Sequence, residues 1–378
     1  MNSGFLLSRR ALLGGAVSGL GAGLAACGGN RRRTSRGYAF VATRASKAIA
    51  VVDLTAFAVR TRISLPAAPA TLIAHPTQHL LYAALPETQT LEEIDSKRWK
   101  LTRKVKLPGK LTAMRFSPGA ERIWALISDP PLLVPIDTVD LQARQPIPLP
   151  AQPASFDLSP RDPAACVGLL DGSIVFADLK TGRVSKPRHI STELGVVRFR
   201  SDGKQVIAAD KAERLLSILD ASSGELMTQL PLPLRPDNVC FKPDGGQLFL
   251  TGEGRDAVVI AYPYRTEVAQ TNLSGRAPGA MAASMDPDYL FVANPGAGSV
   301  TIFDLATQRV VAVTAVGVEP FQIVVTPDQQ FALVLNRGNG DLAVIRIDAI
   351  KPGRAKSAPL FTMIPVGAEP VDMVVRSS

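Results

Sequence analysis

Two arginines flank one aspartate at nearly equal spacings: Arg115, Asp157 and Arg198 lie 42 and 41 residues apart. A carboxylate between two guanidiniums can be held by charge-assisted hydrogen bonds, with guanidinium donors left over. If the fold brings the three together, they predict a site for an anion or another polar ligand. The alternative is an ion-pair ladder that only neutralises buried charge and ties neighbouring elements together.

A second group of polar residues lies in the C-terminal part of the chain, at equivalent positions of a sequence repeat of about 42 residues that is described below. Its members carry charge or hydrogen-bonding groups: Asn238, Arg276, Glu319, Gln322, Glu369 and Asp372. Earlier copies of the repeat carry mainly Ala, Pro and Val at the same positions, so the polarity is one-sided. Such groups around a concave mouth would suit a polar ligand or a peptide end. The alternative is that they are polar because they lie in hydrated loops.

Histidines and cysteines are scarce, with three of each. A zinc cluster and a disulfide framework are therefore nearly excluded. His75 and His79 lack a clear third metal ligand. Cys240 has no histidine at the corresponding positions of the other repeats that could activate its thiol. No Gly-x-Ser-x-Gly, His-Glu-x-x-His, Cys-x-x-Cys or P-loop motif occurs. We predict no catalytic residue, no metal and no cofactor, which disfavours an enzyme but leaves that class open.

The composition bounds the class of protein. Of the 378 residues, 46% are apolar and 20% are charged, so a packed core is possible and bulk disorder is excluded. The net charge of +9 is modest and scattered along the chain, and therefore does not point to nucleic acid. After the first 27 residues, no apolar run is long enough to span a bilayer.

The N-terminal segment has the pattern of an export address. Ser8-Arg9-Arg10 precedes an uncharged apolar run, Ala11–Leu20, and Leu24-Ala25-Ala26 precedes Cys27. This order resembles a lipobox, which implies a signal peptide in residues 1–26, lipidation of Cys27 and a basic linker in residues 27–36. The paired arginines also resemble a twin-arginine signal. We expect an exported protein, anchored by lipid in the periplasm or at the cell surface; the alternative is an uncleaved membrane anchor.

The remaining chain repeats one unit eight times. The best copy runs from Leu290 to Asp328 and alternates apolar runs of four to seven residues with Gly, Pro, Asn and Asp. This predicts short strands joined by tight turns. The position that closes the third strand recurs every 41 or 42 residues, at Asp53, Asp95, Asp137, Asp178, Asp220, Tyr262, Asp304 and Arg346.

The pattern resembles the YVTN-type β-propeller repeat, most strongly in residues 236–345. The shared features are a strand ending in Asn294, a second ending near Asp304-Leu305, a Val316-Gly317 start and a closing Pro327-Asp328. The resemblance implies an all-β propeller of four-stranded antiparallel blades in residues 37–378. The repeat count predicts eight blades, although the resembled family more often has seven, which is the alternative.

The two ends of the propeller are predicted to share one blade. The propeller begins near residue 37 with what would be the second strand of a blade, and it ends with what would be an innermost strand, Val371–Arg376. A three-plus-one closure would pair both terminal edges.

The innermost strands of a propeller line its channel, and their side chains alternate between channel and core. The register predicts a middle ring of Ile73, Arg115, Asp157, Arg198, Cys240, Ala282, Val324 and Val374. Asn238, Gln322 and Asp372 should lie inside the mouth where these strands begin, hereafter the start mouth, beside the loops with Arg276, Glu319 and Glu369. The last strand position should also face the channel, at His75, Ser117, Ser159, Arg200, Lys242, Ser284, Thr326 and Arg376.

These observations favour a lipid-anchored extracytoplasmic propeller that binds a protein, peptide or glycan. Two alternative functions are known from propellers with a similar repeat and stay open. One is a lactonase-like hydrolase, and the other is a haem-binding propeller of the cytochrome-d1 type.

Overall fold

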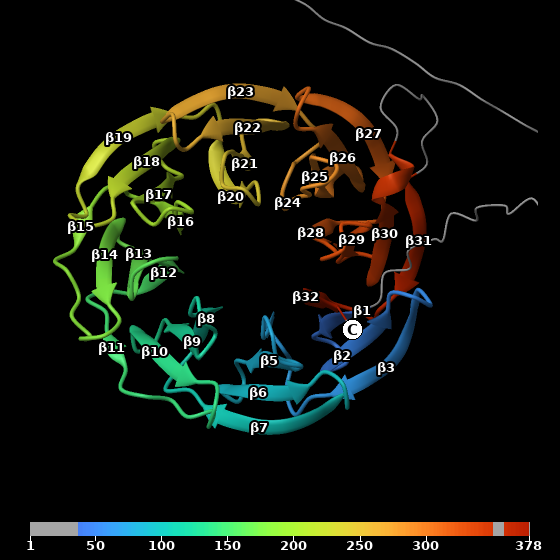
Figure 1. Ribbon diagram of the computed structural model, residues 1–378, viewed down its shortest axis with the longest axis horizontal. Helices are drawn as coiled ribbons and strands as arrows, with labels where there is room; N and C mark the ends of the chain where they lie inside the picture. The colour runs from blue at the N-terminus through green and yellow to red at the C-terminus, as the bar shows by residue number, and fades with distance from the viewer. Residues whose placement is uncertain (1–36, 351–358, 378) are drawn as a thin grey trace, which may run out of the picture. The chain divides into compact units, whose positions relative to one another are not determined.

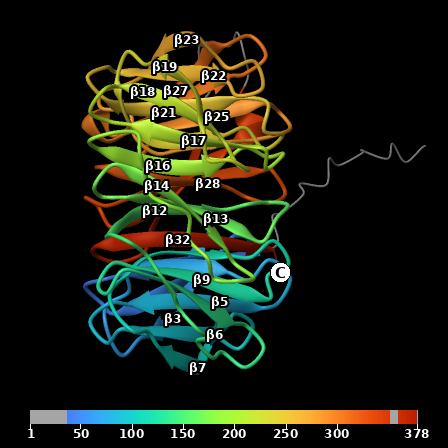
Figure 2. The same ribbon diagram turned by 90° about the vertical axis from the view of Figure 1, so that its left-hand side faces the viewer.

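The computed structural model describes residues 37–350 and 359–377. In these residues, eight four-stranded antiparallel sheets surround a central channel (Figure 1). Figure 2 shows the same ring from its side, with the blades following one another around it. The structure confirms the eight-bladed propeller and excludes the seven-bladed alternative. Cys27 and the predicted signal peptide and linker lie outside the described residues.

The first half of the ring holds blades 1 to 4. Blade 1 contains β1 (Gly37–Thr43), β2 (Ala48–Asp53), β3 (Ala58–Ser64) and β32 (Pro370–Ser377). Blade 2 contains β4 (Thr71–Ala74), β5 (Leu80–Leu85), β6 (Thr90–Asp95) and β7 (Lys100–Lys106). Blade 3 contains β8 (Leu111–Phe116), β9 (Arg122–Ile127), β10 (Leu132–Asp137) and β11 (Ile147–Pro148). Blade 4 contains β12 (Pro153–Leu158), β13 (Ala164–Leu169), β14 (Ser173–Asp178) and β15 (Arg188–His189).

The second half holds blades 5 to 8. Blade 5 contains β16 (Leu194–Phe199), β17 (Gln205–Asp210), β18 (Leu215–Asp220) and β19 (Leu226–Pro231). Blade 6 contains β20 (Arg235–Phe241), β21 (Leu248–Glu253), β22 (Ala257–Tyr262) and β23 (Glu267–Leu273). Blade 7 contains β24 (Met281–Ala283), β25 (Tyr289–Asn294), the short 3-10 helix η1 (Pro295–Ala297), β26 (Ser299–Asp304) and β27 (Arg309–Ala315). Blade 8 contains β28 (Pro320–Val325), β29 (Phe331–Asn336), β30 (Asp341–Arg346), the 3-10 helix η2 (Ile347–Ala349) and β31 (Leu360–Pro365).

Blade 1 closes the ring as the sequence predicts. β1 pairs with β2 on one side and with β32 on the other, so that Val41 lies opposite both Ala50 and Met373. The C-terminal strand thus becomes the innermost strand of the first blade, and neither terminal edge is left unpaired. Within the described residues, no helix is long and apolar enough to cross a membrane.

The core lies between successive blades, where the alternate side chains of the strands meet. The innermost strands alternate their side chains, and we expect one set to be core. The structure buries Leu72, Met114, Phe156, Val197, Ile323 and Met373, whereas other positions of that set, such as Phe116, Val239 and Val325, are half-buried. Burial of such side chains is the main favourable contribution to folding.

The recurring aspartates have a local structural role at the end of the third strand. Asp53 Oδ1 accepts hydrogen bonds from the backbone N–H groups of Thr55 (2.7 Å) and Ala56 (3.1 Å). Asp95 and Asp220 accept equivalent pairs of bonds in their own blades. Because the carboxylate caps the turn, an aspartate is favoured there whatever the function of the protein.

The last position of the innermost strand does not line the channel, so this prediction is wrong for most blades. The side chains of His75, Ser117, Ser159, Arg200, Ser284 and Thr326 are buried. Most of them cap the next turn: Ser284 Oγ accepts from Tyr289 N at 3.1 Å, and Thr326 Oγ1 accepts from Phe331 N at 3.1 Å. The strand alternation ends where the turn begins, and the unpaired N–H groups of the turn capture the polar side chain.

Candidate functional site

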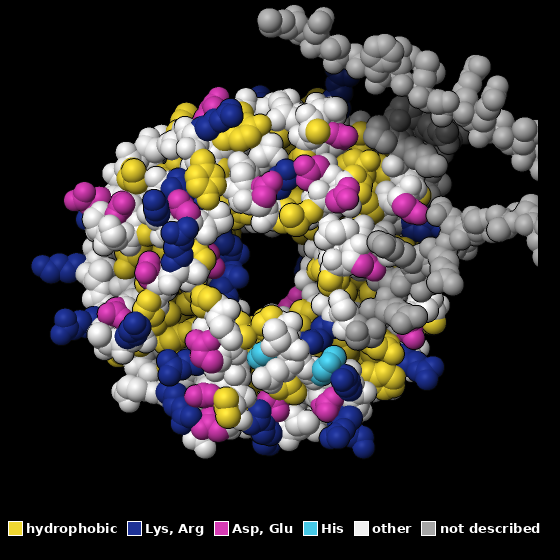
Figure 3. All heavy atoms as spheres, viewed as in Figure 1, with side chains coloured by type: hydrophobic (Ala, Val, Ile, Leu, Met, Phe, Trp, Pro, Cys, Tyr) yellow, Lys and Arg dark blue, Asp and Glu magenta, His cyan; other side chains and the backbone are white. Residues whose placement is uncertain are grey.

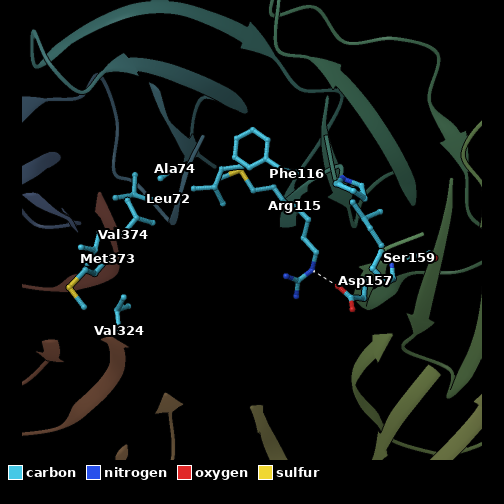
Figure 4. Close-up of a pocket in the computed structure, with 15 residues that line it drawn as sticks. Leu72, Ala74, Arg115, Phe116, Asp157, Ser159, Val324, Met373 and Val374 are labelled. Atoms are coloured by element: carbon cyan, nitrogen blue, oxygen red, sulfur yellow. Dashed lines mark ion pairs between the residues drawn. The ribbon is translucent and has the colours of Figure 1, made fainter. Parts of the chain in front are cut away.

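A cavity of about 670 Å³ opens from the channel between blades 8, 1, 2, 3 and 4. Figure 4 shows its two unlike sides. Arg115 and Asp157 lie on one side, while Val324, Met373 and Val374 lie on the other. This volume is within the usual range of small-ligand sites.

Asp157 joins three neighbouring blades. Its Oδ1 lies 3.3 Å from Arg115 Nε on blade 3, and its Oδ2 accepts a hydrogen bond from Phe199 N on blade 5 at 2.9 Å. Arg115 Nε also donates to the carbonyl of Phe156 at 3.2 Å. The aspartate is therefore already engaged by protein donors, and its carboxylate is held in place rather than free to act as a base.

Arg198 differs from Arg115 because it has no carboxylate partner. Within the described residues it forms no salt bridge, and its one hydrogen bond goes from Nη1 to the neighbouring carbonyl of Val197 at 3.1 Å. Burial and the charge of Arg115 lower the pKa of Arg198 to about 10, against the opposing effect of Asp157. The predicted carboxylate between two guanidiniums thus pairs with only one of them. The ring keeps two guanidiniums for one carboxylate.

The rest of the middle ring is apolar. Ile73, Val324 and Val374 lie on blades 2, 8 and 1 and line the same cavity. In Figure 3, Lys and Arg side chains border the central opening toward β12 and β16, and hydrophobic side chains border it toward β28. The channel therefore offers a ligand a cationic wall and an apolar wall.

Cys240, on the innermost strand of blade 6, is not a reactive thiol. Burial raises its pKa to about 11, and its Sγ donates to the carbonyl of Phe241 at 3.5 Å. A protonated thiol is a poor nucleophile at neutral pH.

Gln322 and Asp372 lie together at the start mouth. Asp372 Oδ1 accepts from Gln322 Nε2 on blade 8 at 2.8 Å. Asp372 Oδ2 accepts from Thr71 Oγ1 at 2.7 Å and from Leu72 N at 2.8 Å, both on blade 2. The carboxylate therefore bridges three blades across the ring closure, and it has little capacity left for a ligand.

The other mouth residues are not joined to this pair. Arg276, Glu319 and Glu369 are exposed, and Asn238 is half-buried. Within the described chain, no hydrogen bond or salt bridge links their side chains to one another, to Gln322 or to Asp372. Glu319 and Glu369 occupy turn positions with φ of 54° and 51°, which is a structural feature of their loops. The structure thus separates the predicted mouth group into exposed or unlinked residues and a hydrogen-bonded network around Asp372, hereafter the Asp372 network. In this network the buried Oε1 of Gln322 has no partner among the described residues.

One buried polar network was missed in the sequence. Glu93 accepts hydrogen bonds from Tyr82 Oη (3.1 Å), Thr102 Oγ1 (2.7 Å) and Arg103 Nε (2.8 Å). Burial opposes ionisation of Glu93, but these donors and the charge of Arg103 hold its pKa below the usual value. The network is fully paired, so it stabilises blade 2 and offers nothing to a ligand. Among the described residues, no cluster of His, Cys, Asp and Glu could hold a metal ion.

Comparisons with known proteins extend the fold assignment. No family model and no curated protein matches this chain. A solved structure of the hydrazine synthase of Kuenenia stuttgartiensis is similar over 75% of this chain and 96% of its own, with 18% identity and a TM-score of 0.57. The dihydro-haem d1 dehydrogenase NirN, solved in complex with DHE, is similar over 89% of this chain and 74% of its own, with 15% identity and a TM-score of 0.71. At these identities, the likeness shows the β-propeller fold.

Proposed function

We propose that this protein is a binding module whose channel receives an acidic peptide segment of a partner protein. The observation that carries the proposal is the guanidinium of Arg198, which is half-buried in the channel wall near Arg115 and has no carboxylate partner among the described residues. A buried charge is costly unless an opposite charge or hydrogen bonds compensate it. An anionic group of a ligand would supply that compensation.

The shape of the cavity narrows the ligand class. Val324, Met373 and Val374 face the Arg115–Asp157 pair across a cavity of about 670 Å³, and Arg198 follows Asp157 in the middle ring. A ligand that fills this cavity and reaches Arg198 therefore needs an apolar part beside its anionic group. A peptide with an acidic residue or a free C-terminal carboxylate next to apolar side chains meets both demands. A neutral glycan lacks the anion and is less well matched to this wall.

The N-terminal address supports a place for this binding outside the cytoplasm. In our proposal, residues 1–26 are a signal peptide, Cys27 carries lipid, and residues 27–36 tether the propeller to the membrane. Loss of fatty-acid labelling in Cys27→Ser would support the anchor, and label that persists in this variant would contradict it.

The two alternative functions are less well matched to the channel. Arg115 and Arg198 could donate hydrogen bonds to the carboxylates of a haem, but no histidine lies in the middle ring as an iron ligand. A hydrolase needs a free acid or base, whereas Asp157 already accepts from Arg115 and Phe199. We therefore propose neither, and absorbance near the Soret region in protein purified from its native envelope would reopen the first.

Affinity capture from native envelopes tests the proposal. Arg198→Met should abolish capture of the partner, because it removes the unpaired charge and keeps an unbranched apolar side chain. Arg60→Met, an exposed arginine on the outer strand β3, is the matched control and should capture as the wild type does. Equal capture by both variants and the wild type would refute the channel site.

A further inference from the structure

The outer rim of the propeller is unevenly charged. It is formed by the outermost strands of the blades, and β31, β3 and β7 follow one another along it (Figure 1). The outermost strands of blades 1 and 2, β3 and β7, carry six cations and no acid: Arg60, Arg62, Lys100, Arg103, Lys104 and Lys106. These six residues are hereafter the cationic rim. In Figure 3, Lys and Arg side chains project outward from these two blades.

Most of the cationic rim is free to meet an external anion. Within the described residues, three of its members are exposed and form no hydrogen bond or salt bridge through their side chains: Arg60, Lys100 and Lys104. Arg62 and Lys106 each donate to a backbone carbonyl, which leaves their charges without a counter-charge.

The neighbouring acids do not neutralise this surface. Glu93 pairs with Arg103, the one member of the cationic rim that has a carboxylate partner in the described chain. Asp53 and Asp95 lie at the turns before β3 and β7, where the Oδ1 of each accepts backbone N–H groups. Neither aspartate forms a salt bridge with the cationic rim among the described residues. The surface therefore keeps a surplus of positive charge.

Protection of the sheet edges does not account for these charges. Lysine on an edge strand discourages pairing with another chain. The outermost strands of blades 7 and 8 are edges of the same kind, yet β27 carries one cation, Arg309, and β31 carries none. β31 instead exposes Phe361 (47%) and Met363 (38%). The cations are thus concentrated on two blades rather than placed on every edge.

The chain that carries the proposed anchor enters the propeller at this part of the ring. Gly37, the first described residue, begins β1 of blade 1. In the anchor that we propose, nine residues separate Gly37 from the lipidated Cys27. Such a segment spans at most roughly 35 Å, because an extended chain advances by about 3.5 Å per residue. A lipid on Cys27 would therefore keep blade 1 close to the bilayer.

We propose that the cationic rim docks on the surface of a membrane that contains anionic lipids. The guanidinium and ammonium groups would contact the lipid phosphates, and Phe361 and Met363 on the neighbouring β31 would enter the headgroup layer. An acidic protein would match the charge, but it would leave these apolar side chains without a partner. The inference rests on the lipid anchor of the proposed function, and the surface lies on the outside of the ring, away from the channel.

Chemical footprinting of lysines on the full chain tests this docking. The protein is held by its anchor in vesicles of phosphatidylcholine, with or without phosphatidylglycerol, and acetylation of single lysines is followed by mass spectrometry. Lys100 and Lys104 should react at least about threefold more slowly in the anionic vesicles, and about 0.5 M salt should remove the difference. Lys186, an exposed lysine of blade 4, is the internal control and should react equally in both. Equal rates at Lys100 and Lys104 in both vesicles would overturn the proposal and leave the cationic rim to an acidic protein.

Energy transfer from Trp99 to a dansyl-labelled lipid measures the same docking independently. Trp99 lies in the turn between β6 and β7, and Trp124→Phe leaves it as the only tryptophan. Because transfer rises as blade 2 approaches the bilayer, Lys100→Gln with Lys104→Gln should lower it by at least about half in anionic vesicles. Unchanged transfer in this double variant would overturn the proposal.

The matched control removes the same charge from another part of the rim. Lys180→Gln with Lys186→Gln replaces two exposed lysines of blade 4 and should leave the transfer from Trp99 unchanged. An equal loss of transfer in this control would assign the effect to net charge rather than to blades 1 and 2, and would overturn the proposal. Melting curves show that each variant is folded.

Failure of the anchor or of the channel is seen in separate measurements. Lys100→Gln with Lys104→Gln should still capture the partner, and Arg198→Met should keep full energy transfer. Flotation with neutral vesicles reports the anchor. A chain that floats only with anionic vesicles would still support the cationic rim, and a chain that floats with neither would contradict both the anchor and the docking.

Discussion

The channel wall and the start mouth use the same kinds of residue to opposite effect. At the start mouth, the carboxylate of Asp372 accepts from Gln322, Thr71 and Leu72, so its acceptor capacity is nearly used within the protein. In the channel wall, Asp157 forms an ion pair with Arg115, and Arg198 has no carboxylate partner among the described residues. The balance of donors and acceptors, rather than polarity as such, separates a structural network from a site that needs a ligand.

The largest effect is expected from breaking the Asp372 network. Asp372→Ala would leave the donors of Thr71, Leu72 and Gln322 without their acceptor, at a cost of about 3 kcal/mol in unfolding free energy. Urea denaturation measures the change. Asp372→Asn, which keeps one acceptor, should lose less stability, and a loss below about 0.5 kcal/mol in Asp372→Ala would show that the network is not structural.

The next largest effect is expected at Asp157. Asp157→Ala removes the partner of Arg115 and the acceptor of Phe199 N, and it leaves two guanidiniums unneutralised, so we expect a loss of about 2 kcal/mol. Adding Arg198→Met should recover part of this loss, because one of the two like charges is gone. A double-mutant cycle gives the coupling, and strict additivity would contradict the view that these charges share one ring.

A much smaller change in stability is expected at Arg198 itself. Arg198→Met removes a charge without a carboxylate partner, so the unfolding free energy should stay the same or rise by up to about 1 kcal/mol. Thermal and urea denaturation measure this. A marked destabilisation would mean that Arg198 holds the fold together, and the proposed binding role would lose its support.

The smallest effects are expected in the exposed loops of the start mouth. Arg276→Ala and Glu319→Gln should each change the unfolding free energy by about 0.5 kcal/mol or less, because these side chains are exposed. Denaturation curves that overlay the wild type are the expected result. A loss near that of Asp372→Ala would show that these residues belong to the Asp372 network.

The repeat made the blades and the middle ring predictable from the sequence. Strands of period two, repeated every 41 or 42 residues, fix which side chains enter the core, so Leu72 and Met373 are buried as expected. The pairing of Asp372 with Thr71 was not predictable, because it joins residues 301 positions apart across the ring closure.

The direction in which a single side chain points at the end of a strand could also not be predicted from the sequence. His75 and Ser284 continue the channel-facing alternation, but each accepts hydrogen bonds from the backbone of the following turn. A histidine or serine in the sequence does not show whether its partner is the backbone or the channel. The sequence also does not show that Arg198 lacks a carboxylate partner. This depends on the second oxygen of Asp157, which accepts a hydrogen bond from Phe199 N instead of pairing with Arg198.

The most direct test of the central claim is to locate an anion in the channel. Crystals of the propeller soaked in bromide should show an anomalous peak beside the Arg198 guanidinium, and crystals of Arg198→Met should lack that peak while keeping those at exposed arginines. A channel without bromide in the wild type, with exposed arginines occupied, would contradict the account.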